Sequence, residues 1–415
     1  MTQAPPPTEK AARGQVLLIA AITAACVAAD AMLYVVLPVH WQEAGLSSLW
    51  QVGILLSLNR LVRLPINPAA GWCFSRVSSK TLILLACLLA IGVSCGYVLA
   101  SGFALWAGLR AAWGVAWSFL KLGGLFTVMD AADDSNRGRF MGLYTGTYRL
   151  GSLAGMLGGG IAADIWGLRT ACACGIALAL MAFALAALRL RRASPVQKRA
   201  EKARQPSAWK GLVRSARFIR IIGSCLMVTL VIEGFLAATL SAYVQFQAGS
   251  AITFAGLTIG CAAAAGAVQS LRWSWNPVLS PMIGRIFDGS SHRGRLFAAC
   301  CWCSALLFFA SALRMPAAPL FILLLGIELC STALITLGDA LAADLASGTQ
   351  TVLVITAYTF ACDLGAALGP MGGYAVINLL GVPAAYAAAG ALLAAMALAW
   401  TLRPDGSGAA SPHTP

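Results

Sequence analysis

Several cationic side chains stand inside hydrophobic runs of this sequence, where an ionised group is costly. Arg110, Trp113, Trp117 and Lys121 follow one another at steps of three, four and four residues. At this spacing they share one face of a helix over about 16 Å. Cations and indoles on one face suit an anionic or flat ligand, because the charges neutralise it and the rings cover it. Packing of the tryptophans between helices is the alternative, but it does not account for the charges.

Other polar side chains in hydrophobic runs repeat this spacing. They are Arg60, Arg63 and Asn67 in one run, Gln269, Arg272 and Asn276 in a second, and Tyr144, Tyr148 and Arg149 in a third. The carboxyls at comparable positions are Asp30, Glu233, Glu328, Asp339 and Asp363. Each acid could be the partner that makes a buried cation tolerable or could carry a proton, and the two roles can coincide. The site should therefore be neutral to mildly positive.

No pattern typical of an enzyme accompanies these charges. The chain has 13 cysteines, most of them in hydrophobic runs, and three histidines far apart, so neither disulfides nor a metal site are indicated. The sequence contains no His-Glu-x-x-His, and its one Gly-x-Ser-x-Gly, from Gly92 to Gly96, lies inside a hydrophobic run and not at the turn between a strand and a helix that a nucleophilic serine needs. We therefore expect no enzyme activity, no metal and no cofactor.

The composition predicts a membrane around these residues. Of the 415 residues 59% are hydrophobic and only 11% charged, with mean hydropathy +0.79, whereas a soluble chain carries about 25% charge. A membrane helix needs roughly 20 apolar residues. The predicted spans are 15–39, 50–72, 81–100, 104–129, 140–163, 169–189, 219–246, 254–281, 295–313, 318–343, 351–378 and 385–402. The expected fold class is an all-α polytopic membrane protein with twelve transmembrane helices.

The net charge of +14 arises mostly from Lys and Arg in loops on one face of the membrane. The segment from Arg189 to Arg220 alone holds eleven basic residues and one acid, and most other loop cations fall on the same side. The excess of Lys and Arg in cytoplasmic loops then places both termini in the cytoplasm. The basic segment is most simply a topology signal that faces anionic lipid, with binding of a partner or nucleic acid as the alternative.

The basic segment also separates two similar halves. Pro68 to Ser75 matches Pro281 to Asp288 at a shift of 213 residues, and Gly151 matches Gly365 at a shift of 214. A near-constant shift indicates duplication of a six-span unit, which in transporters places the substrate site between the halves. The expected organisation is a tail at 1–14, a six-helix half at 15–189, a linker at 190–218, a second half at 219–402 and a tail at 403–415.

The loops after the second and eighth spans share one further pattern. The first reads Gly71-Trp72-Cys73-Phe74-Ser75-Arg76-Val77-Ser78-Ser79-Lys80, and it fits Gly-x-x-x-Asp-Arg-x-Gly-Arg-Lys at Gly71, Arg76 and Lys80. Ser75 stands where that pattern has an acid, whereas the second loop keeps the acid as Asp288. A plain tight turn with basic flanks is the alternative for the first loop.

Two further motifs lie within predicted spans. Span four carries Arg-x-x-x-Gly as Arg110 to Gly114. Span five carries Gly-x8-Gly-x3-Gly-Pro-x2-Gly-Gly, with Met156 in place of Pro. Its glycines are Gly142, Gly151, Gly155, Gly159 and Gly160. Generic packing of glycine-rich helices is the alternative for span five. With these motifs the chain resembles the major facilitator superfamily over essentially its whole length.

The resemblance implies two pseudo-symmetric six-helix halves and proton-coupled export, because the span-five glycines mark antiporters more than uptake symporters. It links Arg110 to proton coupling. It also places the first span of each half along the cavity, so Asp30 and Glu233 are candidates to carry the proton. Span eleven should lie against span two, which predicts that Asp363 pairs with one of the span-two arginines.

The candidate residues fall into three roles. Substrate binding is assigned to Arg60, Arg63, Arg110, Trp113, Trp117, Lys121, Tyr148, Arg149 and Arg272. Proton coupling is assigned to Asp30, Glu233 and Arg110. Gating is assigned to Gly71, Arg76, Gly151, Gly155, Gly159, Asp288 and Asp363.

The leading interpretation is a secondary transporter of the bacterial inner membrane that exports a small anionic or polar metabolite in exchange for protons. The run from Leu58 to Pro68 is similar to a group of drug efflux proteins and alcaligin-type siderophore exporters, which suggests a siderophore or drug-like substrate. The expected partners are substrate, protons and lipid, with no nucleic acid, and the protein is expected to act as a monomer. A proton-coupled uptake symporter and a non-transporting sensor are the alternatives.

Overall fold

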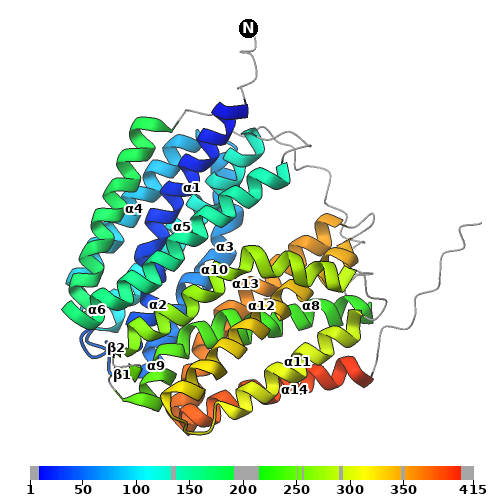
Figure 1. The fold of residues 1–415 in the computed structure, drawn as a ribbon. Coiled ribbons are helices and arrows are strands. Elements are labelled where there is room, and N and C mark those ends of the chain that lie inside the picture. The colour runs from blue at the N-terminus through cyan, green and yellow to red at the C-terminus, as the bar shows by residue number, and fades with distance from the viewer. Residues whose placement is uncertain are drawn as a thin grey trace, which may run out of the picture.

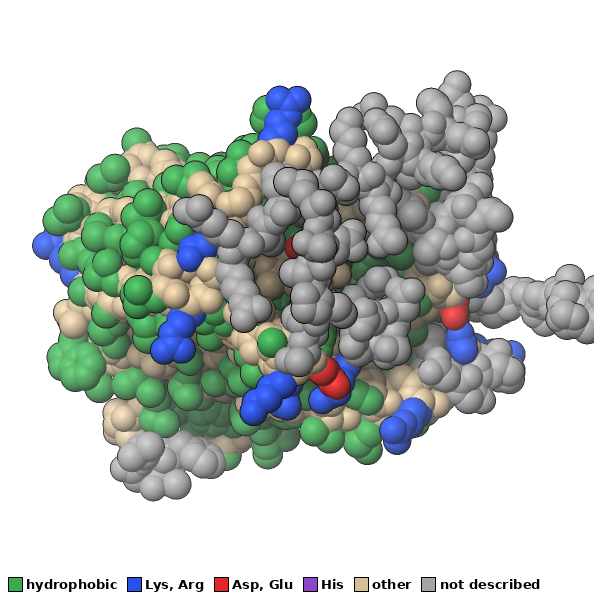
Figure 2. Space-filling view, turned by 90° about the horizontal axis from the view of Figure 1, so that it is seen from above, with side chains coloured by type: hydrophobic (Ala, Val, Ile, Leu, Met, Phe, Trp, Pro, Cys, Tyr) green, Lys and Arg blue, Asp and Glu red, His purple; other side chains and the backbone are tan. Residues whose placement is uncertain are grey.

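The computed structural model describes residues 9–131, 137–190, 215–249, 251–254, 257–288, 293–346 and 351–402, and nearly all of them are helical (Figure 1). Most of the expected linker at 190–218 and the whole of the second tail lie outside these ranges. Hydrophobic side chains cover most of the described surface visible in Figure 2, with a few Lys and Arg side chains among them. Such a surface fits a chain whose surroundings are lipid.

The first group of elements comprises α1 (Glu9–Ala31), α2 (Leu33–Val36), α3 (Leu49–Phe74), α4 (Ser79–Leu99), α5 (Phe103–Ala131) and α6 (Arg137–Arg189). The second comprises α8 (Ala216–Thr229), the π-helix η1 (Leu230–Leu236), α9 (Ala237–Ala248), β1 (Ala251–Phe254), β2 (Leu257–Gly260), α10 (Cys261–Asp288), α11 (Arg293–Ala310), α12 (Ala317–Ala346), α13 (Thr351–Leu380) and α14 (Val382–Leu402). Figure 1 shows the two groups as separate bundles, which we call the first and second half.

The described helices account for all twelve expected spans. Nine helical stretches are long and apolar enough to cross a membrane. One of these is α6, which contains two helices joined at Gly167, whose φ of 81° only glycine adopts readily. The other two spans are α3, with 26 residues, and α10, with 28 residues, which are also long enough to cross a membrane but carry arginines, and each contains two prolines. Counting these gives twelve, and the all-α polytopic fold class is confirmed.

The expected start of span eight was wrong. Residues 254–260 are not helical within their described part, because β1 and β2 form an antiparallel hairpin in which Ile252 faces Ile259. β-branched residues favour strands over helices, and several lie in this short segment. The helix begins only at Cys261.

The two halves meet at one side of the bundle. We call the side where α1 begins and α14 ends the tail side, and the side that carries β1 and β2 the hairpin side. In Figure 1 the halves converge around α2, α9 and the hairpin and diverge toward the tail side. The main contacts between halves are those of α3 with α13 and of α6 with α10.

The repeated glycines pack the corresponding helices of each half. The carbonyl of Ala24 on α1 lies where a side chain on Gly151 would stand, and the carbonyl of Leu226 on α8 does the same at Gly365. Gly155 and Gly159 continue the contact of α6 with α1. Span five therefore packs on span one as span eleven packs on span seven, which agrees with duplication.

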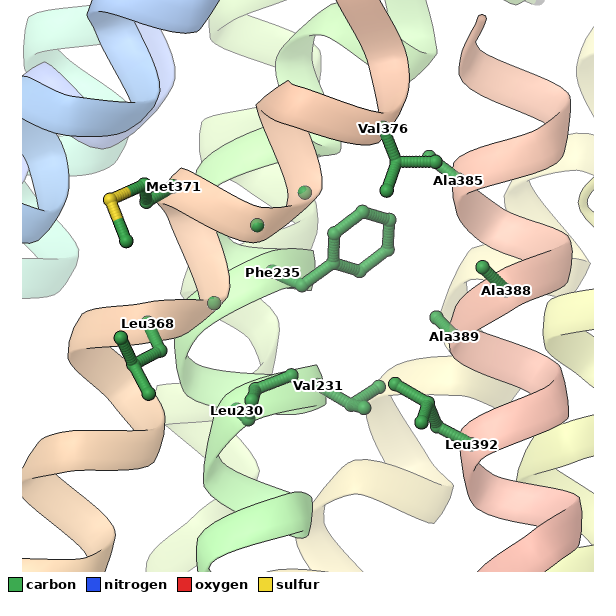
Figure 3. A pocket seen from close by; sticks show the side chains of 13 residues that line it. Leu230, Val231, Phe235, Leu368, Met371, Val376, Ala385, Ala388, Ala389 and Leu392 are labelled. Atoms are coloured by element: carbon green, nitrogen blue, oxygen red, sulfur yellow. The ribbon is translucent and has the colours of Figure 1, made fainter. Parts of the chain in front are cut away.

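An apolar cavity of about 330 Å³ lies between η1, α13 and α14 (Figure 3). Its lining includes Val231 and Phe235 of η1, Gly372 of α13 and Leu392 of α14. The lining carries no charged side chain, so the cavity does not suit an ionic ligand. The charged groups lie elsewhere.

Candidate substrate and proton site

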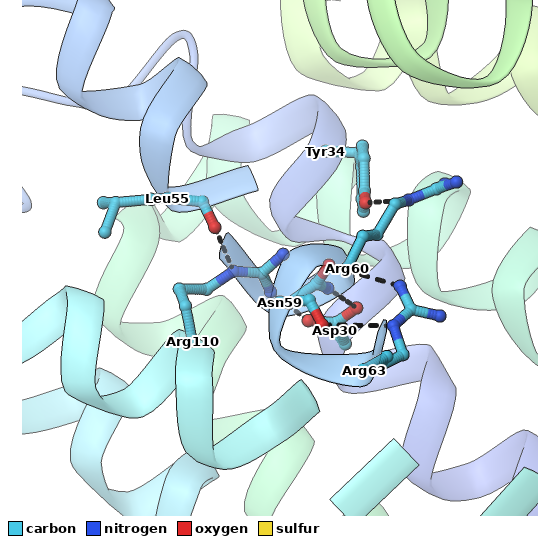
Figure 4. A network of polar contacts seen from close by, with 7 residues as sticks. All are labelled: Asp30, Tyr34, Leu55, Asn59, Arg60, Arg63 and Arg110. Atoms are coloured by element: carbon cyan, nitrogen blue, oxygen red, sulfur yellow. Dashed lines mark hydrogen bonds and ion pairs between the residues drawn. The ribbon is translucent and has the colours of Figure 1, made fainter. Parts of the chain in front are cut away.

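A buried ion pair lies at the centre of the first half. Arg110 on α5 donates to the Asp30 carboxylate on α1, and its Nε donates to the Leu55 carbonyl of α3 over 3.0 Å (Figure 4). Asn59 Nδ2 lies 3.4 Å from the other oxygen of Asp30. The Arg110 side chain is 0% exposed and that of Asp30 is 8% exposed. The Arg110 guanidinium therefore has an anionic partner within the first half.

Two further arginines of α3 lie beside this pair. Arg60 Nε donates to the Tyr34 hydroxyl over 3.0 Å, and Arg63 donates to the carbonyl and side-chain oxygen of Asn59 over 3.1 and 3.3 Å (Figure 4). A neutral partner orients a guanidinium without removing its charge. Both arginines therefore remain able to attract an anion.

Arg60 also connects the two halves. Its Nη1 lies 4.0 Å from the Glu233 carboxylate, and its Nη2 donates to the Glu233 carbonyl over 3.4 Å. Glu233 belongs to the π-helix η1, and such widened turns recur at functional sites. The ion pair is long, so an anion arriving at Arg60 could displace it.

The second half contains its own buried ion pair. Arg272 Nε on α10 lies 3.5 Å from the Glu328 carboxylate on α12, with the two side chains 4% and 2% exposed. The Arg272 guanidinium also lies 4.8 Å from the ring centre of Trp273. Each half thus neutralises one deeply buried arginine internally.

Aromatic rings and cations from both halves line the space between them. The rings of Trp117 and Tyr148 meet edge to face at 5.7 Å, and Arg63 lies 5.9 Å from the centre of Trp117. Arg149 of α6 reaches across to Trp273 of α10, with its guanidinium 4.9 Å from the ring centre. Indole faces attract cations, so these rings hold the arginines in place.

The remaining predicted residues lie around this cluster. Trp113 is buried beside the ring of its neighbour one turn along α5, and Lys121 is half-buried. Lys121 is one of the cations that act electrostatically on Glu233, and Asp363 acts on the two arginines of α3. Asp339 lies farther toward the tail side and accepts a hydrogen bond from Tyr358.

Two contributing residues and one hydrogen bond between the halves were missed in the sequence. Tyr34 lies four residues after Asp30, one helical turn away, which is the signal that could have found it. Trp273 follows Arg272 directly, yet a single tryptophan in a hydrophobic run is not distinctive. The hydrogen bond from Met371 N to Ser57 Oγ, at 3.0 Å, joins α13 to α3, and no local pattern predicts it.

Comparison with known proteins identifies the family of the chain. Residues 19–276 match the family described as Major Facilitator Superfamily. The chain belongs to this superfamily. None of the curated proteins compared with the chain matches it.

Solved structures share the fold of this superfamily member at low sequence identity. A mutant of the peptide transporter POT in complex with alafosfalin gives a TM-score of 0.77 at 13% identity, with 94% of each chain covered. A POT family transporter in complex with 5-aminolevulinic acid gives 0.74 at 12%, covering 95% of this chain and 96% of that one. A bacterial homologue of the human lysosomal transporter Spinster, inward-facing and unoccupied, gives 0.70 at 15%, with 95% of each chain covered.

The loop motif of the superfamily takes a modified form here. Without an acid at position 75, the Ser75 hydroxyl donates to the Trp72 carbonyl over 2.7 Å, and Arg76 lies 4.2 Å from the centre of the Trp72 ring. A side chain on Gly71 would meet open space. Asp288 ends α10, and its side chain lies outside the described set. The gating roles of these residues remain predictions.

Proposed function

We propose that this protein is a proton-coupled secondary transporter of a small anionic molecule, and that the residues between the halves bind both substrate and proton. The observation that carries the proposal is the surplus of cations where the halves meet. Arg110 and Arg272 are each paired within their own half. Arg60, Arg63, Lys121 and Arg149 remain, and they outnumber by one the nearby carboxyls of Glu233, Asp363 and Asp339.

The surplus selects for negative charge in the substrate. Unit charges about 6 Å apart at an effective dielectric of about 20 interact by about 3 kcal/mol. One uncompensated cation at that range attracts an anion and repels a cation by a similar energy. The neighbouring rings of Trp117, Tyr148 and Trp273 favour a substrate with a flat or delocalised group. We propose a siderophore or drug-like anion.

The direction of opening follows from where the halves touch. Gly160 packs against the backbone of Ala262, and Ser270 Oγ donates to the Leu153 carbonyl over 3.2 Å, both toward the hairpin side. We propose that the basic loops place the tail side, with both termini, in the cytoplasm of a bacterium. The halves are then closed toward the outside and parted toward the cytoplasm, and transport consists of rocking between this state and its opposite.

Export by proton antiport is the proposed direction, supported by the span-five glycines. Asp30 and Glu233 are the proposed proton carriers. A second candidate, uptake by proton symport, is favoured by the Arg60–Glu233 contact. A substrate anion that takes Arg60 releases the Glu233 carboxylate, which can then take up a proton. Anion and proton would bind together in that case, whereas an antiporter requires them to compete.

A comparison of metabolites distinguishes these possibilities even while the substrate is unidentified. Cells that lack the protein, cells that express it and cells that express Glu233→Gln are grown together, and small anions in cells and medium are identified by mass spectrometry. Export predicts an anion that moves from the cells to the medium only with the wild-type protein. Symport predicts the reverse movement. If no anion differs between wild type and Glu233→Gln, the proposal fails.

A further inference from the structure

We propose that Asp164 holds the hairpin side of the transporter shut by binding the N-terminus of α10 from the opposite half, and that His40 releases it. This inference rests on the proposed alternation between two open states. It concerns a part of the molecule that has no role in the substrate and proton site.

The Asp164 carboxylate of α6 is placed directly on the start of α10. Its Oδ2 accepts a hydrogen bond from the backbone N–H of Ala263 over 2.7 Å. Ala263 is the third residue of α10, where an N–H has no acceptor within its own helix. The positive end of the helix dipole adds to this attraction. A side chain on Gly260 would clash with the carboxylate, so the two halves approach closely at this point.

This bond differs from the other contacts that close the hairpin side. The Ser270 to Leu153 hydrogen bond joins two neutral groups, and Gly160 and Ala262 meet only through their backbones. A hydrogen bond to an ionised acceptor is roughly twice as strong as a neutral one. Parting the halves at this side must therefore break the Asp164 contact, and the carboxylate then needs another counter-charge.

His40 can supply that counter-charge from within the same half. Its Nε2 lies 3.7 Å from Asp164 Oδ1, and its Nδ1 lies 2.7 Å from Glu43 Oε1. Glu43 also accepts from the Leu168 N–H over 3.0 Å and lies near Arg169. All these residues belong to the first half, so they stay together when α10 moves away.

The charges around His40 favour its protonated form. The Asp164 carboxylate, 3.7 Å from Nε2, is the main cause of a raised pKa of His40; burial acts against it, and Glu43 adds to it. Burial also opposes the lowered pKa of Glu43, which results from His40, the Leu168 N–H and Arg169.

Opening of the hairpin side changes which groups neutralise Asp164, and this decides how the opening depends on pH. In the closed state Asp164 is shared between α10 and His40, whereas in the open state His40 is its main counter-charge. His40 therefore binds its proton more tightly in the open state, and acid favours opening of the hairpin side. Glu43 and Arg169 keep their positions in both states and do not reverse this sign.

Cys261, the first residue of α10, is a native reporter of this opening. Its side chain is buried, and its Sγ donates to the Gly249 carbonyl over 3.0 Å. The whole protein is placed in lipid nanodiscs and treated with a membrane-impermeant maleimide, and modification of Cys261 is followed by peptide mass spectrometry. Opening of the hairpin side raises the labelling rate.

Asp164→Ala is expected to raise the rate about tenfold to a hundredfold, because a hydrogen bond to a charged group is lost. Asp164→Asn keeps an oxygen that can accept from Ala263 and should give a smaller rise. Thr170→Ala is the matched control, because Thr170 bonds only the Trp166 carbonyl of its own helix, and it should change nothing. Equal labelling of Cys261 in Asp164→Ala and Asp164→Asn, which both remove the charge beside Cys261, would overturn the proposal.

The role of His40 is tested by the ratio of labelling in wild type to that in His40→Gln. This ratio cancels the reagent's own dependence on pH. It should rise as the pH falls from about 8 to about 5, the range in which histidine titrates, and a flat ratio would overturn the part played by His40. Labelling needs no substrate, so a negative labelling result overturns only the proposed role of Asp164 and His40. The proposed function fails separately, if Cys261 labelling behaves as expected but no proton-linked transport is found.

Discussion

Neutralising Asp30 and Arg110 separately and together tests whether they form one functional unit. Both side chains are buried, and without Asp30 the guanidinium of Arg110 would keep neutral acceptors such as the Leu55 carbonyl. Asp30→Asn or Arg110→Gln alone leaves one buried charge unpaired, which costs about 3–5 kcal/mol of stability. The double variant restores neutrality and should recover to within about 1 kcal/mol of wild type.

The assay has two readouts. Thermal unfolding in detergent should rank the double variant near wild type and each single variant well below both. In proteoliposomes the stable double variant should exchange substrate between the two sides but no longer respond to a pH gradient. Glu9→Gln is the control, because the Glu9–Arg139 pair of the same half is more than half exposed and contributes little. Single variants as stable as wild type, or a double variant still driven by the pH gradient, would show that the two residues do not act as a unit.

Three further variants test other parts of the site. Glu328→Gln should destabilise the protein by about 3–5 kcal/mol, as measured by unfolding, because it leaves Arg272 buried without a counter-charge; an unchanged stability would contradict the second ion pair. Gly155→Ala should lower stability by about 1–3 kcal/mol, since the added carbon meets the Ala28 backbone of α1, and no loss would argue against close packing there. Lys121→Gln should weaken binding of benzoate relative to the neutral benzamide, measured by calorimetry, and an equal change for both probes would contradict an anion-selective site.

The architecture was largely predictable because hydrophobicity and charge place each span independently of its neighbours. One boundary was wrong where a short segment could adopt either structure, at β2, whose β-branched Thr258 and Ile259 were counted as part of a span. The π-helix around Glu233 was also unpredictable, since nothing in Leu230–Leu236 distinguishes it from an ordinary α-helix.

The sequence predicted which residues lie at the site better than it predicted which of them pair with one another. Spacing alone brought Trp117 and Lys121 to one helical face. It could not show that Asp30 pairs with Arg110, because the two are 80 residues apart and other acids were equally available. The partner of a buried charge depends on how helices pack, and that information is spread over the whole chain.

Proton coupling of anion transport is best tested in proteoliposomes with an imposed pH gradient, using the anion identified by the metabolite comparison. A proton-coupled transporter should move the anion in net amount when the gradient is present, and Glu233→Gln should abolish this drive. Transport that proceeds at the same rate with and without the gradient, or equally in Glu233→Gln, would contradict proton coupling through this site.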